Sequence, residues 1–166
     1  TIGRQVLEGG EQLGIDEVTF AKKSAILTDR SKVQALINQG AKLAADDESA
    51  KSFNAIGIKP SYTVDQALEN ATVVVDCTPV GNKNKAEVYE KYLNNTKGFI
   101  AQGSEFGFGK MYARGINDQT LVAGKDKFLQ VVSCNTHNLS ILVKSIGMND
   151  GKNPELLDHA RFVCIR

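Results

Sequence analysis

Short apolar runs alternate with segments of helical periodicity along most of the chain. Apolar runs predict strands at residues 18–21, 41–45, 72–76, 98–101, 119–123, 128–133 and 160–165. Helical patterns predict helices at residues 2–12, 31–39, 50–56, 63–68, 85–93 and 136–146. The valine-rich run at 72–76 is typical of a central parallel strand. The alternation therefore predicts an α/β fold built on a mostly parallel sheet.

Residues that favour helix ends stand at several of these boundaries. Ser31 and Thr63 are suited to cap helix N-termini, and Gly40 and Gly57 to end helices. The polar stretch 149–154 predicts a turn or linker and is the best candidate for a boundary region.

The composition is that of an ordinary globular protein, since 42% of the 166 residues are hydrophobic, 23% are charged and the formal net charge is +1. Without a basic block or an apolar stretch of bilayer length, we expect no nucleic-acid and no membrane partner. Cys77, Cys134 and Cys164 stand far apart and lack a paired spacing, which argues against a disulfide framework and against a metal site. This cysteine usage indicates a cytoplasmic location.

Cys134 lies where the predicted strand at 128–133 gives way to the predicted helix at 136–146. At such a junction, free backbone N–H groups and the positive end of the helix dipole lower the pKa of a thiol and favour the nucleophilic thiolate. Cys134 is therefore a candidate nucleophile. The alternative is a small apolar residue filling a buried corner, which is the interpretation given to Cys77 and Cys164.

Open parallel sheets bind ligands beyond the carboxyl ends of their strands. Small and polar residues follow four predicted strands, at residues 22–24, 77–81, 102–105 and 133–136. Asp76 is either a catalytic carboxylate or, as we favour, a turn residue that accepts backbone N–H bonds. His137 is either a phosphate ligand or a residue of the first helical turn, and His159 is predicted at the surface.

Two features near the start of the chain point to a dinucleotide. Gly3, in a Thr-Ile-Gly-Arg run that opens a helix, is similar to the last glycine of G-x-G-x-x-G, where a helix start holds pyrophosphate. Lys22 and Lys23 stand where an NAD-specific fold carries an acidic residue, so they favour the 2′-phosphate of NADP. The alternative for these lysines is a solvated surface pair.

Taken in order, the segments resemble archaeal-type (type II) glyceraldehyde-3-phosphate dehydrogenases over most of the chain. The resemblance is carried by Thr-Ile-Gly-Arg at 1–4, Ala-Lys-Lys-Ser at 21–24, Val-Asp-Cys-Thr-Pro at 75–79, Asn-Lys-Asn-Lys at 82–85, Gln-Gly-Ser-Glu at 102–105, Gly-Lys-Asp at 124–126 and Val-Val-Ser-Cys-Asn-Thr at 131–136. Ser104 stands where the family has glycine, His137 stands where it commonly has threonine, and the loop after Pro79 is shorter than usual.

The chain starts inside a helical pattern without a methionine and ends directly after a strand-like run, so we expect an internal fragment of a longer protein, as the resemblance also implies. The expected architecture is a Rossmann-like, mostly parallel sheet that lacks its first strand, followed by the first strand of an α+β catalytic domain. Residues 1–134 would form the NAD(P)-binding domain, and residues 135–166 the cysteine helix and the start of the catalytic domain.

The resemblance also implies a reaction. The Cys134 thiolate attacks the aldehyde of glyceraldehyde 3-phosphate, hydride passes to NADP or NAD, and inorganic phosphate releases an acyl phosphate. Substrate or phosphate contacts then fall on Ser133, Asn135, Thr136 and His137, and cofactor contacts on Ile2, Gly3, Lys22, Lys23, Thr78, Pro79, Gly103, Ser104 and Arg166.

The resemblance implies a homotetramer for the full-length protein. Because the first glycines, the second arginine and the later histidine of the family are missing, we expect no turnover from these 166 residues alone. Two other functions stay open, namely a related semialdehyde or acyl-phosphate reductase and a dinucleotide-binding module that has lost its chemistry.

Overall fold

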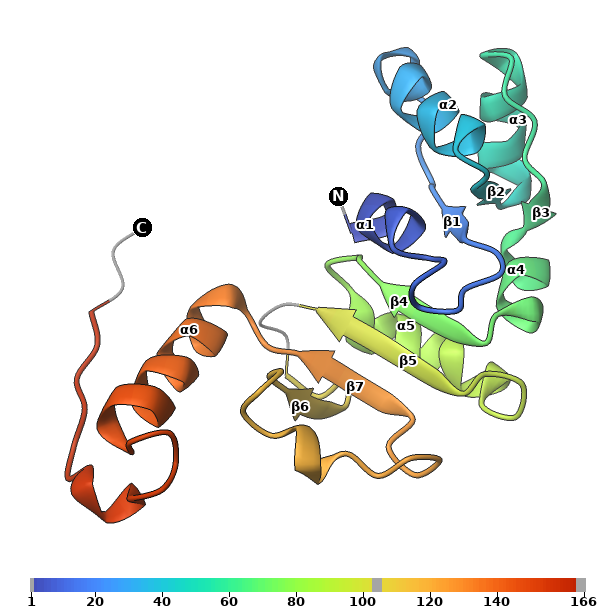
Figure 1. The fold of residues 1–166 in the computed structure, drawn as a ribbon. Coiled ribbons are helices and arrows are strands. Elements are labelled where there is room, and N and C mark those ends of the chain that lie inside the picture. The colour runs from blue at the N-terminus through green and yellow to red at the C-terminus, as the bar shows by residue number, and fades with distance from the viewer. Residues whose placement is uncertain (1, 103–105, 164–166) are drawn as a thin grey trace. The chain divides into compact units, whose positions relative to one another are not determined.

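The chain divides into two compact units, Thr1–Ala71 and Thr72–Arg166. The computed structural model describes residues 2–102 and 106–163 (Figure 1), so the predictions for Gly103, Ser104, Cys164 and Arg166 lie outside the described residues. Each unit contains a parallel sheet with helices, which confirms the predicted α/β, Rossmann-like class. The predicted domain division at residue 134 stays a prediction.

The first unit contains a three-stranded parallel sheet in the order β1-β2-β3. Its elements are α1 (Ile2–Glu8), β1 (Thr19–Ala21), α2 (Arg30–Asn38), β2 (Lys42–Ala45), α3 (Asp47–Ala55), β3 (Tyr62–Thr63) and α4 (Val64–Asn70). β1, β2 and the four helices follow the predicted alternation, although α1 ends at Glu8 rather than at residue 12. The short strand β3 was not predicted.

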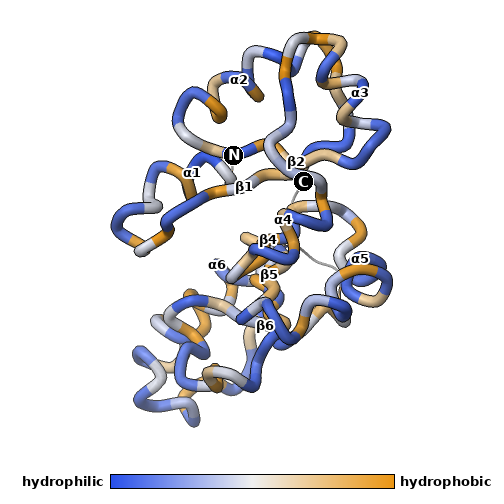
Figure 2. Tube along the Cα trace, turned by 90° about the vertical axis from the view of Figure 1, so that its right-hand side faces the viewer, coloured by the Kyte–Doolittle hydropathy of each residue, from blue (hydrophilic) through white to orange (hydrophobic). Residues whose placement is uncertain are grey.

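The core of the first unit forms where α2 and α3 meet β2. Val33, Leu43, Ala45, Phe53 and Ile58 are each at most 3% exposed and form one apolar cluster. Hydrophilic and hydrophobic positions alternate along α2 and α3 (Figure 2), so that one face of each helix can lie on the sheet. Burial of these apolar side chains is what stabilises the short strands of this unit.

Side chains at the helix starts decide where α3 and α4 begin. Thr63 caps α4 as predicted, because its hydroxyl accepts a hydrogen bond from the Gln66 N–H while the Gln66 side chain accepts one from the Thr63 N–H. The predicted helix at 50–56 begins earlier, at Asp47, because the Asp46 carboxylate accepts from the Ser49 N–H at 2.8 Å.

The ends of α2 confirm one prediction and correct another. Ser31 lies inside α2, which begins at Arg30, so Ser31 is not the N-cap. Gly40 follows the helix with a φ of 98°, a left-handed conformation that favours glycine, so the predicted end is confirmed. Gly57, with a φ of 77°, does the same after α3.

The second unit contains a four-stranded parallel sheet in the order β4-β5-β7-β6. Its elements are β4 (Val73–Asp76), α5 (Gly81–Glu87), η2 (Tyr89–Tyr92), β5 (Gly98–Gln102), β6 (Lys110–Tyr112), η3 (Asp118–Thr120), β7 (Phe128–Val131), α6 (Cys134–Leu142), η4 (Val143–Gly147) and η5 (Pro154–Leu156). Figure 1 shows β5 and β7 in the middle of this sheet, with α5 behind β4 and β5.

Aromatic rings form the core of the second unit. The Phe99 ring stacks on Tyr89 at 5.2 Å and on Phe128 at 4.9 Å between centroids, and Phe108 meets the Phe128 ring edge-on at 5.5 Å. Phe99 and Phe108 are at most 1% exposed. This cluster ties β5 and β7 to the segment around η2.

Several predictions for the second unit are corrected. β4 is parallel as predicted but lies at an edge of its sheet, where Val73 and Val75 are 49% and 40% exposed. The helix predicted at 85–93 begins at Gly81 and ends at Glu87, where η2 follows, and α6 begins at Cys134 rather than at residue 136. The strand β6 was not predicted.

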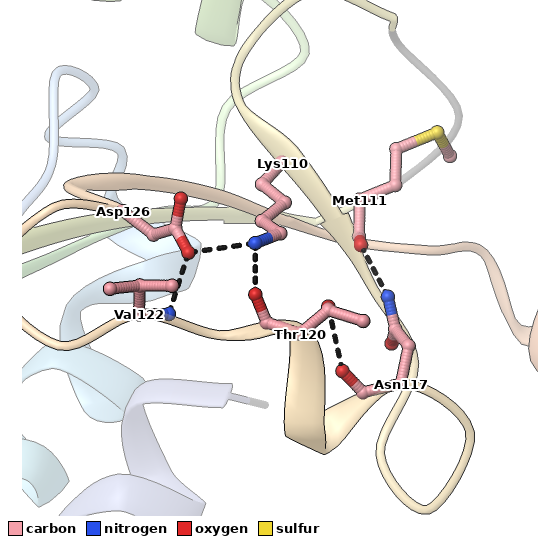
Figure 3. A network of polar contacts seen from close by, with 6 residues as sticks. All are labelled: Lys110, Met111, Asn117, Thr120, Val122 and Asp126. Atoms are coloured by element: carbon pink, nitrogen blue, oxygen red, sulfur yellow. Dashed lines mark hydrogen bonds and ion pairs between the residues drawn. The ribbon is translucent and has the colours of Figure 1, made fainter.

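The strand predicted at residues 119–123 is absent because side chains bind its backbone (Figure 3). Lys110 Nζ forms an ion pair with Asp126 Oδ2 at 2.8 Å and also donates to the Thr120 carbonyl. The Val122 N–H donates to the same carboxylate at 2.7 Å. These contacts hold the crossover between β6 and β7 as an irregular loop that contains η3.

The last predicted strand, at residues 160–165, is also wrong over its described part. Residues 160–163 are exposed and belong to no strand. An apolar run forms a strand where a neighbouring strand can accept and donate its backbone hydrogen bonds, and the described part of this unit supplies none there.

Candidate functional site

The four strands of the second unit end at one edge of its sheet. The parallel register aligns Asp76 with Ala101, and both Ala101 and Met111 with Gln130. Parallel strands have their carboxyl ends on the same side, so the segments that follow β4, β6 and β7 leave the sheet at this edge. This is the edge at which open parallel sheets bind ligands, and it carries both described thiols.

Cys134 is the first residue of α6 and its thiol side chain is exposed. The strand before it ends at Val131, so the predicted strand-to-helix junction is confirmed. The alternative of a buried corner is wrong, because an exposed side chain fills no core. An exposed thiol among the unpaired N–H groups of a helix start is open to an electrophile in solution.

The residues beside Cys134 shape the start of the helix. Ser133 is the N-cap, and its hydroxyl accepts from the Thr136 N–H at 3.3 Å and lies 2.9 Å from the Thr136 hydroxyl. The Cys134 Sγ lies 4.0 Å from Asn135 Oδ1. The structure therefore brings Ser133, Asn135 and Thr136 to the first turn around the thiol, as the sequence suggested.

His137 connects α6 to the loop that follows β6. Its Nε2 lies 2.9 Å from the Arg114 carbonyl oxygen, a contact in which a protonated Nε2 donates. A hollow of about 370 Å³ lies between this loop, the end of α6 and the segment that follows α6. The hollow is lined by Arg114, Gly115, Ile116, Ile141, Lys144, Ser145 and Asp150, none of which the sequence singled out.

Asp76 is 3% exposed and accepts three hydrogen bonds at the end of β4. The donors are the Thr78 N–H at 2.6 Å, Asn84 Nδ2 at 2.9 Å and the Tyr89 hydroxyl at 2.8 Å. Burial raises the pKa of Asp76, but hydrogen bonds from Asn84, Thr78 and Tyr89 together outweigh it and lower the pKa below its usual value. The favoured interpretation of Asp76 as a turn residue is confirmed, and Asn84 is a partner that the sequence did not reveal.

The groups around Asp76 stay protonated at neutral pH. Burial, followed by the hydrogen bond to Asp76, raises the pKa of Tyr89, so its hydroxyl remains a donor. Partial desolvation of the thiol, followed by the charge of Asp76, raises the pKa of Cys77. Cys77 was predicted in the core but is exposed, because it follows the last residue of β4 in a surface loop. These shifts favour a neutral thiol at Cys77.

Thr78 and Pro79 belong to this same loop, residues 77–80, called the 77–80 loop below. Both residues are exposed at the carboxyl end of β4. Thr78 Oγ1 accepts from Asn84 Nδ2 at 2.9 Å and from the Val80 N–H at 3.3 Å. The loop therefore presents an ordered surface to solvent.

Lys22 and Lys23 follow β1 in the first unit. Lys22 Nζ forms an ion pair with Asp29 Oδ2 at 2.9 Å and donates to Ser24 Oγ at 3.3 Å. Lys22 is the main cause that lowers the pKa of Asp29. The structure thus gives Lys22 an acidic partner, whereas the Lys23 side chain is exposed and its carbonyl accepts from the Ser49 hydroxyl.

Ile2 and Gly3 open α1, which is also in the first unit. Gly3 is exposed, and a Cβ built there would meet nothing within 4 Å. Packing within the protein therefore does not require glycine at this position. The open space beside Gly3 would let a ligand approach the backbone.

The described residues offer neither a metal-binding cluster nor a membrane-spanning helix. Residues 2–102 and 106–163 contain no group of three or more His, Cys, Asp or Glu side chains placed to bind a metal ion. Among the helices of these ranges, none has the length and apolar character needed to cross a bilayer.

Fold and site together define an α/β protein with Rossmann-like parallel sheets and an exposed cysteine at a strand-to-helix junction. Comparison with known proteins places glyceraldehyde-3-phosphate dehydrogenases of archaea among those similar to the chain. The protein from Methanobacterium bryantii is 38% identical over 94 residues, which are 55% of this chain and 27% of that protein. No protein-family model matches the chain.

Two further relatives extend the similarity. The glyceraldehyde-3-phosphate dehydrogenase of Thermococcus kodakarensis is 33% identical over 131 residues, 74% of this chain and 34% of that protein. That of Pyrobaculum neutrophilum is 25% identical over 152 residues, 90% of this chain and 42% of that protein. The chain thus spans between 27% and 42% of the length of these three relatives.

Proposed function

We propose that the protein carrying this chain is a phosphorylating glyceraldehyde-3-phosphate dehydrogenase of the archaeal type, with Cys134 as its nucleophile. The observation that carries the proposal is the exposed thiol at the first residue of α6, at the carboxyl edge of a parallel sheet. The similarity to archaeal enzymes of that name supports the choice of substrate.

Cys134 forms and breaks the covalent bond in the proposed reaction. Its thiolate attacks the aldehyde carbon, and the carbonyl oxygen gains a proton as the hemithioacetal forms. Loss of hydride from that carbon, and of the hydroxyl proton, leaves a thioester on the Sγ atom. An oxygen of inorganic phosphate then attacks the acyl carbon, the C–S bond breaks, and the thiolate is restored as the acyl phosphate leaves.

The residues around Cys134 bind and orient the substrate in this proposal. Ser133 caps the helix start by accepting from the Thr136 N–H. The first-turn N–H groups that this cap does not occupy can donate to phosphate or to the developing oxyanion. The exposed amide of Asn135 beside the Sγ atom can donate to the substrate oxygen. His137 is assigned to the phosphate through the ring nitrogen that faces away from Arg114.

A nicotinamide dinucleotide, when bound, supplies the hydride acceptor. We assign Ile2 and Gly3 to its pyrophosphate, Lys22 and Lys23 to a 2′-phosphate, and Thr78 and Pro79 to the nicotinamide side, with Gly103, Ser104 and Arg166 as further contacts. The open space at Gly3 and the exposed ammonium group of Lys23 fit this group. Because Lys22 already pairs with Asp29, Lys23 is the stronger candidate for distinguishing NADP from NAD.

The proposal is tested by following reduction of NADP and NAD with glyceraldehyde 3-phosphate, with and without inorganic phosphate, in the natural protein. We expect phosphate-dependent turnover that falls at least about 1,000-fold in Cys134→Ser, since loss of a nucleophile removes the covalent route. Asn138→Ala is the matched control, because Asn138 is an exposed residue of the same helix, and its turnover should stay within about twofold of the wild-type value.

Two results would contradict this assignment. Turnover with aspartate semialdehyde but not with glyceraldehyde 3-phosphate would favour the related semialdehyde reductase. A binding module without chemistry would be favoured by two observations together. The protein would bind the dinucleotide without turning over either aldehyde, and iodoacetamide would alkylate Cys134 no faster than Cys77.

A further inference from the structure

A buried carboxylate at the end of β4 is costly unless donors surround it. Asp76 accepts hydrogen bonds from the Thr78 backbone N–H, from the Asn84 side-chain amide on α5 and from the Tyr89 hydroxyl in η2, and these bonds offset the loss of hydration. Apolar residues in place of a buried polar network often leave stability unchanged or improve it. The fold therefore does not require this network for stability alone, and holding the backbone in one conformation is a second role that the network can serve.

Asn84 links the carboxylate to the 77–80 loop. Its Nδ2 lies 2.9 Å from Asp76 Oδ2 and also 2.9 Å from Thr78 Oγ1. The Thr78 N–H donates to the other Asp76 oxygen, and the Val80 N–H donates to Thr78 Oγ1. These hydrogen bonds thus fix both the backbone and the side chain of Thr78, while the residues of the loop stay exposed to solvent.

Ring packing fixes the position of the Tyr89 side chain, independently of the hydrogen bond that its hydroxyl donates. Its ring stacks on Phe99 at 5.2 Å and meets Phe108 at 6.4 Å between centroids, and the residue is 8% exposed. The ring position determines where the hydroxyl lies, so the aromatic core determines the orientation of the Asp76 carboxylate.

We propose that Asp76, Asn84 and Tyr89 are positioning residues that hold the 77–80 loop in the shape that binds the dinucleotide. This inference rests on the proposed function, which assigns Thr78 and Pro79 to the nicotinamide side. The three residues act through the loop and do not touch the ligand. A loop fixed in advance binds more tightly, because its ordering cost is not subtracted from the binding free energy.

Asn84→Ala is the main test, with the dinucleotide dissociation constant measured by fluorescence titration with NADPH and NADH. Alanine favours helix more than asparagine does, so α5 itself is not weakened. We expect about tenfold weaker binding, the effect of one good hydrogen bond on an equilibrium. Tyr89→Phe, which keeps the ring packing and removes the donor, should weaken binding in the same direction.

Asn117→Ala is the matched control. Asn117 also makes two amide hydrogen bonds of 2.9 Å, to the Met111 carbonyl and from the Ala113 N–H, but it holds the end of β6 (Figure 3). The control should lower thermal stability about as much as Asn84→Ala and leave the dissociation constant within about twofold of the wild-type value.

Cys77 gives a second measurement that does not depend on activity, because its exposed thiol lies within the 77–80 loop. Alkylation by iodoacetamide, followed peptide by peptide with mass spectrometry, should be several-fold faster in Asn84→Ala than in the wild type and in Asn117→Ala. Asn84 is neutral, so its removal changes the loop without removing a charge. Asp76→Asn would lack this advantage, since it also alters the charge beside the thiol.

The outcomes separate the inference from the proposed function. The positioning role alone would be overturned if the wild-type protein binds NADPH or NADH and both Asn84→Ala and Tyr89→Phe leave the dissociation constant and the rate of Cys77 alkylation unchanged. A wild-type protein that binds neither dinucleotide would overturn the proposed function, and the positioning role with it.

Discussion

Asp76 shows how one carboxylate can depend on residues that the sequence does not mark as its partners. The expectation that it accepts a backbone N–H bond needed only the turn chemistry of Asp, and the bond from Thr78 confirms it. Asn84 and Tyr89 lie further along the chain and reach the carboxylate because α5 and η2 return beside β4. Sequence reasoning located Cys134 for the opposite reason, since strand, cap and helix start are all local to it.

The low pKa of Asp76 predicts a pH-dependent contribution to stability. Because the pKa is lower in the folded protein than in the unfolded chain, the carboxylate stabilises the fold fully above about pH 4 and less as the pH falls through the folded value. Asp76→Asn should therefore lower the free energy of unfolding by about 3 kcal/mol at neutral pH, with the loss shrinking toward pH 2. Urea unfolding across this pH range measures the difference.

Tyr112→Phe is the control for this experiment. The Tyr112 hydroxyl also donates to a carboxylate, that of Asp118, but this carboxylate is exposed. Its removal should change the unfolding free energy far less than Asp76→Asn does. A loss in Asp76→Asn that stays the same from pH 7 to pH 2 would show that the charge of Asp76 contributes nothing.

At the scale of elements, the formation of a strand depends on a neighbouring strand to hydrogen-bond with as much as on the apolar pattern of its own residues. β5 and β7 were predicted because their apolar residues are those of a buried sheet, and Phe99 and Phe128 confirm this by stacking. β6 carries Lys110 and Tyr112 and no apolar run, so nothing in its sequence separated it from a loop. Residues 160–163 show the reverse case, an apolar run that is exposed and unpaired.

The start of β6 depends on a close backbone approach at Gly109. A Cβ built on Gly109 would lie 2.1 Å from the Phe128 carbonyl oxygen, a distance that no rotamer change can relieve. Gly109→Ala should therefore separate β6 from β7 and lower the free energy of unfolding of the second unit by about 3 kcal/mol. Urea unfolding followed by near-ultraviolet circular dichroism of the aromatic cluster measures this loss.

Gly98→Ala supplies the comparison, because Gly98 is the first residue of β5 in the same sheet and its nearest contact would be an ordinary 3.7 Å to the Lys127 carbonyl oxygen. This variant should change stability by less than about 1 kcal/mol. Equal losses from the two substitutions would mean that the general cost of replacing a glycine at the start of a strand, rather than the approach of β6 to β7, explains the result.

At the scale of the whole molecule, each unit has its own core. The first is the aliphatic cluster around Leu43 and Phe53, and the second is the aromatic cluster around Phe99. The alternation of strands and helices predicted the α/β class of both units. It did not predict the division after Ala71, because that division depends on which helices meet which strands and not on any change in pattern or composition.

Separate cores predict separate local stabilities. Leu43 is 0% exposed, and Leu43→Ala should cost about 2–5 kcal/mol through the lost burial and the cavity left behind. Hydrogen exchange should then become faster at the amides of β2 and α3, while those of β5 and β7 keep their wild-type rates. Phe99→Ala, in the other core, should give the reciprocal pattern. If Leu43→Ala accelerates exchange equally in β2 and in β5, the two units unfold as one cooperative structure, and the prediction of separate local stabilities is wrong.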